Sequence, residues 1–335
     1  MISHRLLLSL AILAGLSAPA TTPCEKQGNS RDVRLWERFL EWLPEDTETL
    51  FVAEGPFAVP QRKQRIGFEE SARLLPTGPL LVPPDGLLSN QLIGQKILCA
   101  VEGSRHFRPP QGLGMMPYQG AHIVQFEASA SNAVNQAFQF WLKRAQRSIE
   151  LAGKQIAVFT ELQERDTWSY FIAHPKPGVL IFGTDQAYLE ETLERSGRKP
   201  ARRALPSDLP EWQNVDSKAD VWAIRHYRRE SAGQDPSSPL GGAAPANVPD
   251  PAAIGLTFWY NAHSDNATRV RYLSTATNAC EIVSDGWNNP SEGLTPEIKQ
   301  VGLGSVEILT SVSQERTGRS FLFVLLAYLG HAIYL

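Results

Sequence analysis

Three consecutive strand-like segments in the middle of the chain constrain its fold more than any other feature. Residues 156–162 are apolar, residues 167–173 alternate between large apolar and polar side chains, and residues 179–183 are apolar again. Short turns that are polar or rich in Pro and Gly separate the segments. This spacing is typical of an antiparallel meander, in which each strand pairs with the next. The sequence therefore predicts an antiparallel sheet here.

An amphipathic helix is predicted just before the meander. Its apolar residues recur at helical spacing and form one stripe, which consists of Val134, Phe138, Trp141, Leu142, Ala145 and Ile149. Lys143, Arg144 and Arg147 face away from that stripe. Such a helix needs an apolar surface to cover, most simply a sheet. We therefore expect an α+β fold, in which antiparallel strands in meanders and hairpins are covered by helices.

Apolar periodicity and breakers predict further elements on both sides of this centre. Asp32 and Asp185 are expected N-caps, and Pro44, Gly55-Pro56 and Gly197 are expected stops. The expected strands cover 49–53, 96–101, 122–126, 254–260 and 268–272, and the expected helices 32–43, 69–75, 87–93, 185–195 and 278–287. Both halves contain strand–turn–strand followed by a helix, so two related halves are one interpretation.

The first twenty residues have the pattern of a secretory signal peptide. Arg5 supplies the positive start, residues 6–16 are almost entirely apolar, and Ala18 and Ala20 place small residues before the expected cleavage. The apolar run is shorter than the roughly 20 residues that span a bilayer. An N-terminal membrane anchor is the alternative. We expect an exported protein, periplasmic or extracellular, that begins near Thr21.

Composition divides the remaining chain into three regions. Residues 21–229 form an N-terminal α+β region, residues 230–252 form a linker or loop rich in Pro, Gly and Ala, and residues 253–335 form a C-terminal α+β region. The last of these ends in an apolar segment, residues 320–335, which is also shorter than a membrane span. We expect it to be a buried helix, with a peripheral membrane contact as the alternative.

Charge and cysteine content exclude several classes of protein. The chain carries 32 Lys plus Arg against 35 Asp plus Glu, so it lacks the strongly basic surface of a nucleic-acid partner. Three cysteines are too few for a disulfide scaffold. Cys99 and Cys280 both lie in apolar segments, where they could pair with each other, pair with Cys24, or remain reduced.

One set of short motifs matches the serine beta-lactamases and penicillin-binding proteins. Ser196 with Lys199 fits SxxK, Ser264-Asp265-Asn266 fits SDN, and Arg316-Thr317-Gly318 could replace KTG. In that mechanism the serine begins a buried helix, whereas Ser196 is predicted to end one beside Gly197. SDN lies in a predicted turn, where these residues are common for conformational reasons. We interpret the set as a chance match.

A long loop offers the best candidate for binding. Residues 103–119 are predicted to connect two strands without regular structure, and long irregular loops in compact domains usually have a function. The candidate binding residues are Arg105, His106, Phe107, Arg108, Met115, Met116 and Tyr118. The arginines suit an anionic partner. No histidine pair has metal-ligand spacing and no nucleotide-binding motif is present, so neither a metal nor a cofactor is predicted.

The acidic residues that follow the basic stretch near residue 200 are interpreted as solvated surface carboxylates rather than a paired acid and base. They are Asp208, Glu211, Asp216 and Asp220.

Two segments resemble a family of exported proteins. Trp42-Leu43-Pro44-Glu45-Asp46-Thr47, followed by an apolar strand, resembles the opening of uncharacterised exported bacterial proteins whose mature domain begins with Leu-Pro-x-Asp-Thr. Val179 to Asp185, before a helix, is similar to a second stretch in such proteins. The resemblance implies an α+β fold and a bacterial envelope setting, and it implies no activity.

We therefore expect a non-catalytic envelope protein that binds an unidentified protein or small molecule. A hydrolase with an unrecognised site is the alternative. A cleft that gathers polar groups would favour the hydrolase.

Overall fold

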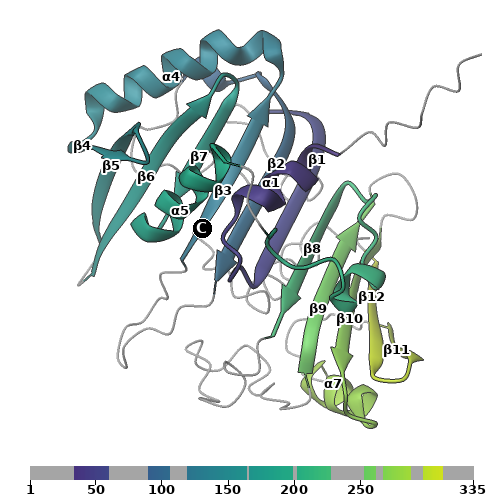
Figure 1. The fold of residues 1–335 in the computed structure, drawn as a ribbon. Coiled ribbons are helices and arrows are strands. Elements are labelled where there is room, and N and C mark those ends of the chain that lie inside the picture. Colours follow the sequence, from purple (N-terminus) through teal and green to yellow (C-terminus); the bar gives the residue numbers. More distant parts are fainter. Residues whose placement is uncertain are drawn as a thin grey trace, which may run out of the picture. The chain divides into compact units, whose positions relative to one another are not determined.

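The strands of the described residues form one antiparallel sheet. The computed structural model describes residues 34–59, 90–105, 119–163, 166–198, 202–227, 253–261, 267–287 and 297–311. The chain divides into two units, Met1–Val33 and Arg34–Leu335, and all described residues belong to the second. That unit contains a 12-stranded sheet with helices packed on it, and its neighbouring strands pair antiparallel (Figure 1). The expected α+β class is confirmed.

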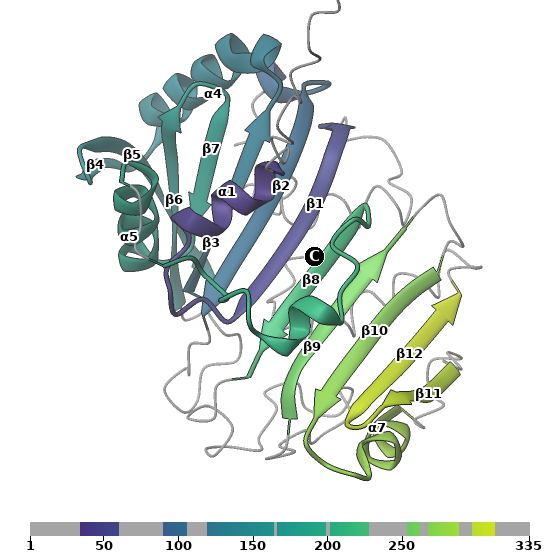
Figure 2. The ribbon, with the colours of Figure 1, turned by 45° about the vertical axis from the view of Figure 1, so that its right-hand side comes forward.

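Outwards from the centre of the sheet, the strand order follows the chain for three strands on each side, and the later strands are then added in reverse order. The first seven strands are β1 (Thr49–Ala58), β2 (Lys96–Arg105), β3 (Gln119–Phe126), β4 (Arg147–Leu151), β5 (Lys154–Gln163), β6 (Asp166–Lys176) and β7 (Val179–Gly183). The last five are β8 (Val221–His226), β9 (Ala253–Tyr260), β10 (Ala267–Ser274), β11 (Glu297–Gly302) and β12 (Ser305–Ser311). Their order in the sheet is β11-β12-β10-β9-β8-β1-β2-β3-β7-β6-β5-β4. Figure 2 shows β1 and β8 side by side at the centre.

Alternation along the strands gives the sheet two apolar faces. In β1, Phe51 and Ala53 belong to one core cluster, and Leu50 and Val52 belong to the other. On the first face α4 (Ser131–Arg144) buries four side chains, and α7 (Ala279–Trp287) contacts β11 and β12. On the second face α1 (Leu35–Trp42) packs against α5 (Gln186–Ser196) and the strands beneath. Each large side chain buried in this way contributes roughly 1.5–3 kcal/mol.

The predicted meander is confirmed as β5, β6 and β7. The helix before it is shorter than predicted, because α4 ends at Arg144 and Ala145 is an extended C-cap. Ile149, predicted to belong to the helical stripe, instead lies in β4 opposite Ile156. Ala152 and Gly153 both have positive φ, of 49° and 72°, which suits the tight turn that joins β4 to β5. Hairpin pairing therefore takes Ile149 away from the helix.

Helix ends agree with the sequence in one case and differ in another. Asp185 caps α5 as predicted, since its carboxylate accepts a hydrogen bond from the backbone N–H of Tyr188 at 2.8 Å. Gly197 is the C-cap of the same helix, also as predicted. The predicted cap Asp32 is wrong for α1, whose N-cap is Arg34 and has no side-chain cap.

Several strands are longer or additional. β1 continues through Gly55-Pro56, where it was predicted to end, because an irregularity in register between Glu54 and Phe57 accommodates the two residues. Of the helix predicted over 87–93, residues 87–89 lie outside the described ranges, and the described part contains the 3-10 helix η2 (Asn90–Leu92). Two further 3-10 helices are η3 (Ala128–Ala130) and η4 (Pro210–Gln213). The hairpin of β11 and β12 was not predicted.

Of the alternatives left open for Cys99 and Cys280, a disulfide between the two does not form. Both thiols are free. Cys99 is buried in the core of the second face, whereas Cys280 on α7 packs against the core of the first face, so the sheet separates them. Burial in this apolar setting raises the pKa of the Cys99 thiol, which keeps it protonated and unreactive.

Some predictions concern residues outside the described ranges. These are the signal peptide, Cys24, the helix over 69–75, the region 230–252 and the apolar segment 320–335. Residues 228–252 join β8 to β9, which are neighbours in the sheet. Within the described ranges no helix combines the length and apolarity needed to cross a membrane.

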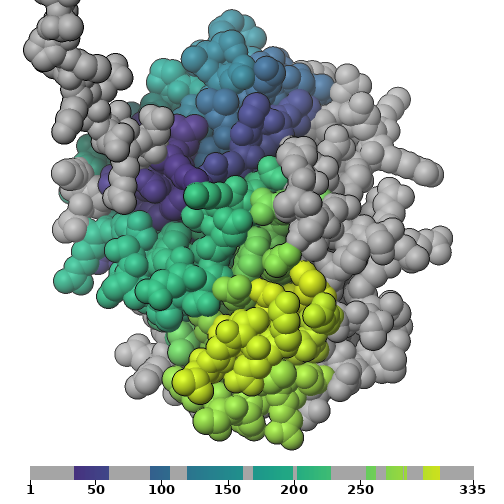
Figure 3. All heavy atoms as spheres, turned by 90° about the vertical axis from the view of Figure 1, so that its right-hand side faces the viewer, coloured from purple at the N-terminus to yellow at the C-terminus, as the bar shows by residue number. Residues whose placement is uncertain are grey.

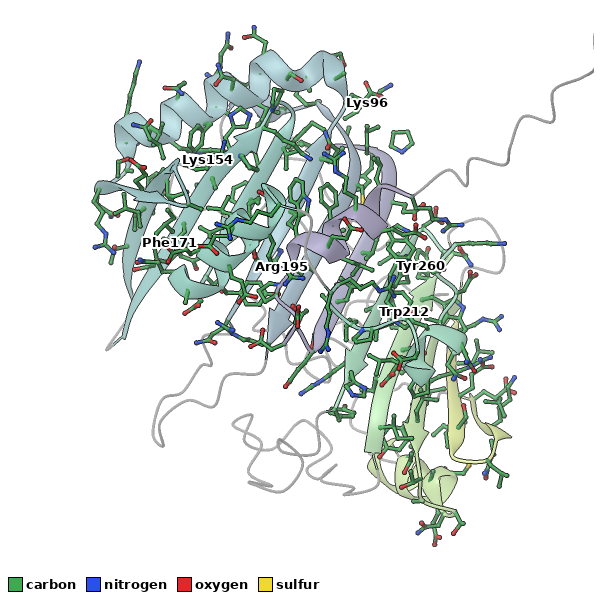
Figure 4. The ribbon with its side chains drawn as sticks, viewed as in Figure 1. Lys96, Lys154, Phe171, Arg195, Trp212 and Tyr260 are labelled. Atoms are coloured by element: carbon green, nitrogen blue, oxygen red, sulfur yellow. The ribbon has the colours of Figure 1, made fainter. Side chains whose placement is uncertain are left out.

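Three tryptophans connect the elements that precede the two central strands. Trp36 of α1 stacks on Trp212 of η4, with ring centroids 5.9 Å apart, and Trp222 of β8 meets both rings edge-on, at 4.9 and 5.7 Å. Trp212, labelled in Figure 4, belongs to η4 and is partly exposed, and the guanidinium of Arg203 lies over its ring. This tryptophan cluster therefore fixes α1 and η4 over the junction of β1 and β8.

We predict that Trp222→Ala destabilises the protein by about 3–5 kcal/mol, because a fully buried indole is lost and a cavity remains. Trp212→Ala is the matched control, since its ring is partly exposed and should cost clearly less. Urea denaturation of both variants checks this. Equal losses of stability in the two variants would show that the complete burial of Trp222 adds nothing to its contribution.

Candidate functional site

A row of polar side chains lies on the second face, where the ends of four neighbouring strands, β8, β1, β2 and β3, lie side by side. His226 ends β8, and its backbone N–H donates to the carbonyl of Glu48 at 2.8 Å. The backbone N–H of Glu48 donates to Ser104 at 2.9 Å, which aligns Glu48 with Arg105 at the end of β2. Arg105 in turn pairs with Gln119, the first residue of β3. We call His226, Glu48, Arg105 and Gln119 the polar row.

Arg105 is held by groups from three separate segments. Its guanidinium donates to Asp46 and to Gln119, each at 2.7 Å, and lies 3.8 Å from the carboxylate of Asp185. It also lies over the ring of Tyr188, 5.3 Å from the centroid. Burial opposes the charge, but the hydrogen bond and charges of the carboxylates outweigh it, so the pKa of Arg105 is above its usual value. Arg105 is thus a clasp between β2, β3, α5 and the segment before β1.

The Leu-Pro-x-Asp-Thr segment forms the floor of this clasp. Leu43 is fully buried, and the Thr47 hydroxyl donates to the carbonyl of Pro44 at 2.7 Å. The same hydroxyl is 2.7 Å from the Tyr188 hydroxyl, which is buried and whose pKa burial raises. Since Asp46 binds Arg105, every polar residue of the segment except Glu45 has a partner in the clasp. Asp185 closes the second segment, residues 179–185, so the two stretches that suggested a family meet at Arg105.

The predicted binding residues are only partly located. Arg105 was predicted to lie in a loop over 103–119, but it is the last residue of β2, and β3 begins at Gln119. The strands are longer than predicted because their pairing continues to Arg105 opposite Gln119. His106, Phe107, Arg108, Met115, Met116 and Tyr118 lie outside the described residues. The loop therefore leaves and rejoins the sheet at two polar-row residues that bond to each other.

A buried carboxylate lies at the other end of the polar row. Glu211 of η4 is completely buried, and its Oε1 lies 2.8 Å from Nδ1 of His226. Its Oε2 is buried without a hydrogen-bond partner. Glu211 was predicted to be a solvated surface carboxylate, and that is wrong. Gly255 of β9 makes room for it, because a Cβ there would lie 2.0 Å from Oε1. Pairing with Glu211 orients the His226 ring, whose side chain is 25% exposed.

A second acid–imidazole pair lies on the opposite face of the sheet. Glu102 of β2 and His122 of β3 are directly opposite each other, with Oε2 and Nδ1 3.5 Å apart. Both are almost completely buried. Phe51 and Phe182 continue the same row on either side, so this pair is enclosed by the apolar core.

Further carboxylates surround the clasp. Arg195 of α5, labelled in Figure 4, lies 3.6 Å from Glu45 and donates to the carbonyl of Glu41. Burial raises the pKa of Glu191, and the nearby charge of Asp46 raises it further. The described residues contain no group of three or more His, Cys, Asp or Glu that could hold a metal ion.

The SxxK serine is not at the start of a helix. Ser196 is the last residue of α5, and its hydroxyl donates to the carbonyl of Leu193 at 2.7 Å. This is the position predicted for it. Lys199, Ser264 to Asn266, and Arg316 to Gly318 lie outside the described residues.

Comparison with known proteins gives no relative. No protein-family model matches the sequence, no curated protein matches it, and no solved structure matches the fold. Function must therefore be argued from the site.

We predict that Glu191→Gln stabilises the protein at neutral pH. A carboxyl whose folded pKa is raised costs stability above its unfolded pKa of about 4.5 and nothing below it. The gain in stability should therefore shrink as the pH falls from the raised folded pKa towards the unfolded pKa of about 4.5. Thermal melts of both proteins from neutral to acidic pH check this. A gain that does not change with pH would contradict it.

Proposed function

We propose that this protein is an exported, non-catalytic binding module. Its partner binds at the strand ends that carry the polar row. One observation supports this best. Residues 106–118 connect Arg105 to Gln119, and residues 228–252 connect the strand that ends with His226 to the strand that contains Gly255. Two long connections thus begin and end at the same edge. Long loops on a rigid sheet are a common setting for binding residues.

The arrangement gives Arg105 a positioning role in this proposal. Its charge is satisfied by Asp46 and Asp185, so it holds the base of the loop and leaves recognition to the loop residues. Arg108, with Phe107 and the methionines, then supplies a basic and apolar surface for a protein or small molecule that carries negative charge.

We also propose that the two halves of the sheet are related. In the first, β1, β2 and β3 form a meander, α4 follows, and β7 returns to pair with β3. In the second, β8, β9 and β10 form a meander, α7 follows, and β12 returns to pair with β10. The halves meet through β1 and β8, and the first half has the additional hairpin of β4 and β5. The matching order supports duplication of one unit.

A hydrolase is the second candidate, and the Glu211–His226 pair favours it. A buried carboxylate that orients an imidazole is the arrangement used to activate a nucleophile or water. Esterase and amidase substrates can be tested with His226→Gln. Turnover that is lost in this variant and retained in Ser196→Ala would support hydrolysis at this pair and contradict the non-catalytic proposal.

The binding proposal predicts that the loop and its base respond differently to mutation. Phe107→Ser with Arg108→Ser should leave the melting temperature nearly unchanged and abolish binding of the native partner. Arg105→Met is the matched contrast, because it leaves two carboxylates without their cation and should cost about 1–3 kcal/mol. Melting curves and quantitative cross-linking in the native host check both. A large loss of stability in the loop variant, with the partner retained, would make the loop structural.

Export makes a separate prediction. Since residues 6–16 precede Ala18 and Ala20, the protein isolated from its native host should begin near Thr21. N-terminal sequencing of cell fractions checks this. Protein that keeps Met1 and stays in the cytoplasm would overturn the proposal of export.

A further inference from the structure

The strand β11 forms one edge of the sheet and is unusually exposed. Among the described strands it is the last in the sheet order, and it pairs with β12 on one side. Five of its six residues are exposed, namely Glu297, Lys299, Gln300, Val301 and Gly302, and Ile298 is partly buried. Figure 3 shows the yellow residues of this hairpin at the molecular surface.

Apolar side chains are exposed at the same place. The described residues include three exposed large hydrophobic side chains, and two of them, Val301 and Leu303, lie at the end of β11 and in its turn. Leu303 is 98% exposed. An edge strand with adjacent exposed apolar groups is a template for pairing with another strand.

The charges of β11 determine which strand fits. When two copies of one strand pair antiparallel, side chains directly opposite each other must point to the same face of the joined sheet. This condition holds only in registers in which one residue lies opposite its own copy. When that residue is Ile298, Glu297 of each copy lies opposite Lys299 of the other. When it is Lys299, two like charges lie opposite each other, which is destabilising. The sequence of β11 is therefore complementary to itself in one register.

Neighbouring groups preserve the charge of this edge. Lys299 lies 3.3 Å from Glu307 of β12, and Glu307 also accepts hydrogen bonds from Arg271 of β10. Burial tends to raise the pKa of Glu307, but these hydrogen bonds outweigh it and the pKa is lowered. Glu307 is thus held by cations on both sides, and it fixes Lys299 on the face of the sheet where Glu297 of a second strand would lie.

We propose that β11 is a homodimer interface, in which two copies pair their β11 strands antiparallel about Ile298. The occupant of the edge is a second copy of this chain, selected by the Glu297–Lys299 pairing. The interface joins two sheets into one continuous sheet. It is independent of the polar row, because β12, β10 and β9 lie between β11 and the strand β8 that carries His226, so either proposal can fail without the other.

The test uses single charge reversals and their mixture. The wild-type chain should dimerise in sedimentation experiments over concentrations up to about 0.1 mM. Glu297→Lys and Lys299→Glu should each weaken dimerisation by about tenfold or more, because each places like charges opposite each other twice. Mixing the two variants should restore a heterodimer, since both contacts then become complementary. Arg147→Glu on β4, the opposite edge, is the control and should have no effect.

A cross-link locates the register without relying on charge. Ile298→Cys should form an intermolecular disulfide under mild oxidation, because directly opposed residues have Cα atoms about 4.5–5.5 Å apart. Leu303→Cys, which is more exposed but away from the symmetry axis, should cross-link much more slowly. A monomeric wild type, or a dimer insensitive to both reversals, would overturn the proposal. So would equal cross-linking of the two cysteine variants.

Discussion

The pairing of β1 with β8 is the interaction on which the rest of the structure depends. Five residue pairs join these strands, and hydrogen bonds from Glu54 to Asp220 and from His226 to Glu48 extend the ladder at both ends. Without it the sheet would be two smaller sheets, each with an open central edge. The tryptophan cluster lies directly over this junction, so α1 and η4 stabilise the contact that aligns the polar row.

That alignment explains how the site is assembled. None of the polar-row residues is close to the others in sequence, apart from Arg105 and Gln119, which are joined by a loop. Register alone places them side by side, because cross-strand neighbours are fixed by the ladder. Two carboxylates then hold the row in place: the buried Glu211 through His226, and the partly exposed Asp46 through Arg105.

Local chemistry was predictable from the sequence, and burial that depends on distant residues was not. The cap at Asp185 and the meander were correct because their signals lie within a few residues. Ile149 was assigned to a helix because its spacing fits, and only pairing with Ile156 decides otherwise. Glu211 resembled a surface acid because the space that accepts it is provided by Gly255, in another strand. Arg105 was predicted to bind a partner from within a loop, and its own partners Asp46 and Asp185 could not be predicted because they come from distant parts of the chain.

The central position of β8 has a consequence for how the chain acquires its structure. β1 is made early and ends at Ala58, but its second partner β8 begins only at Val221. All the strands from β2 to β7 lie between them in the sequence. Contacts so distant in sequence form slowly, because a large loop must close before they contribute. Until β8 arrives, the inner edge of β1 presents unpaired backbone to any other strand. While the chain emerges, it therefore passes through a stage in which half of the sheet is complete and β1, later at its centre, is an exposed edge strand. A chaperone bound at this stage would prevent β1 from pairing with strands of other chains.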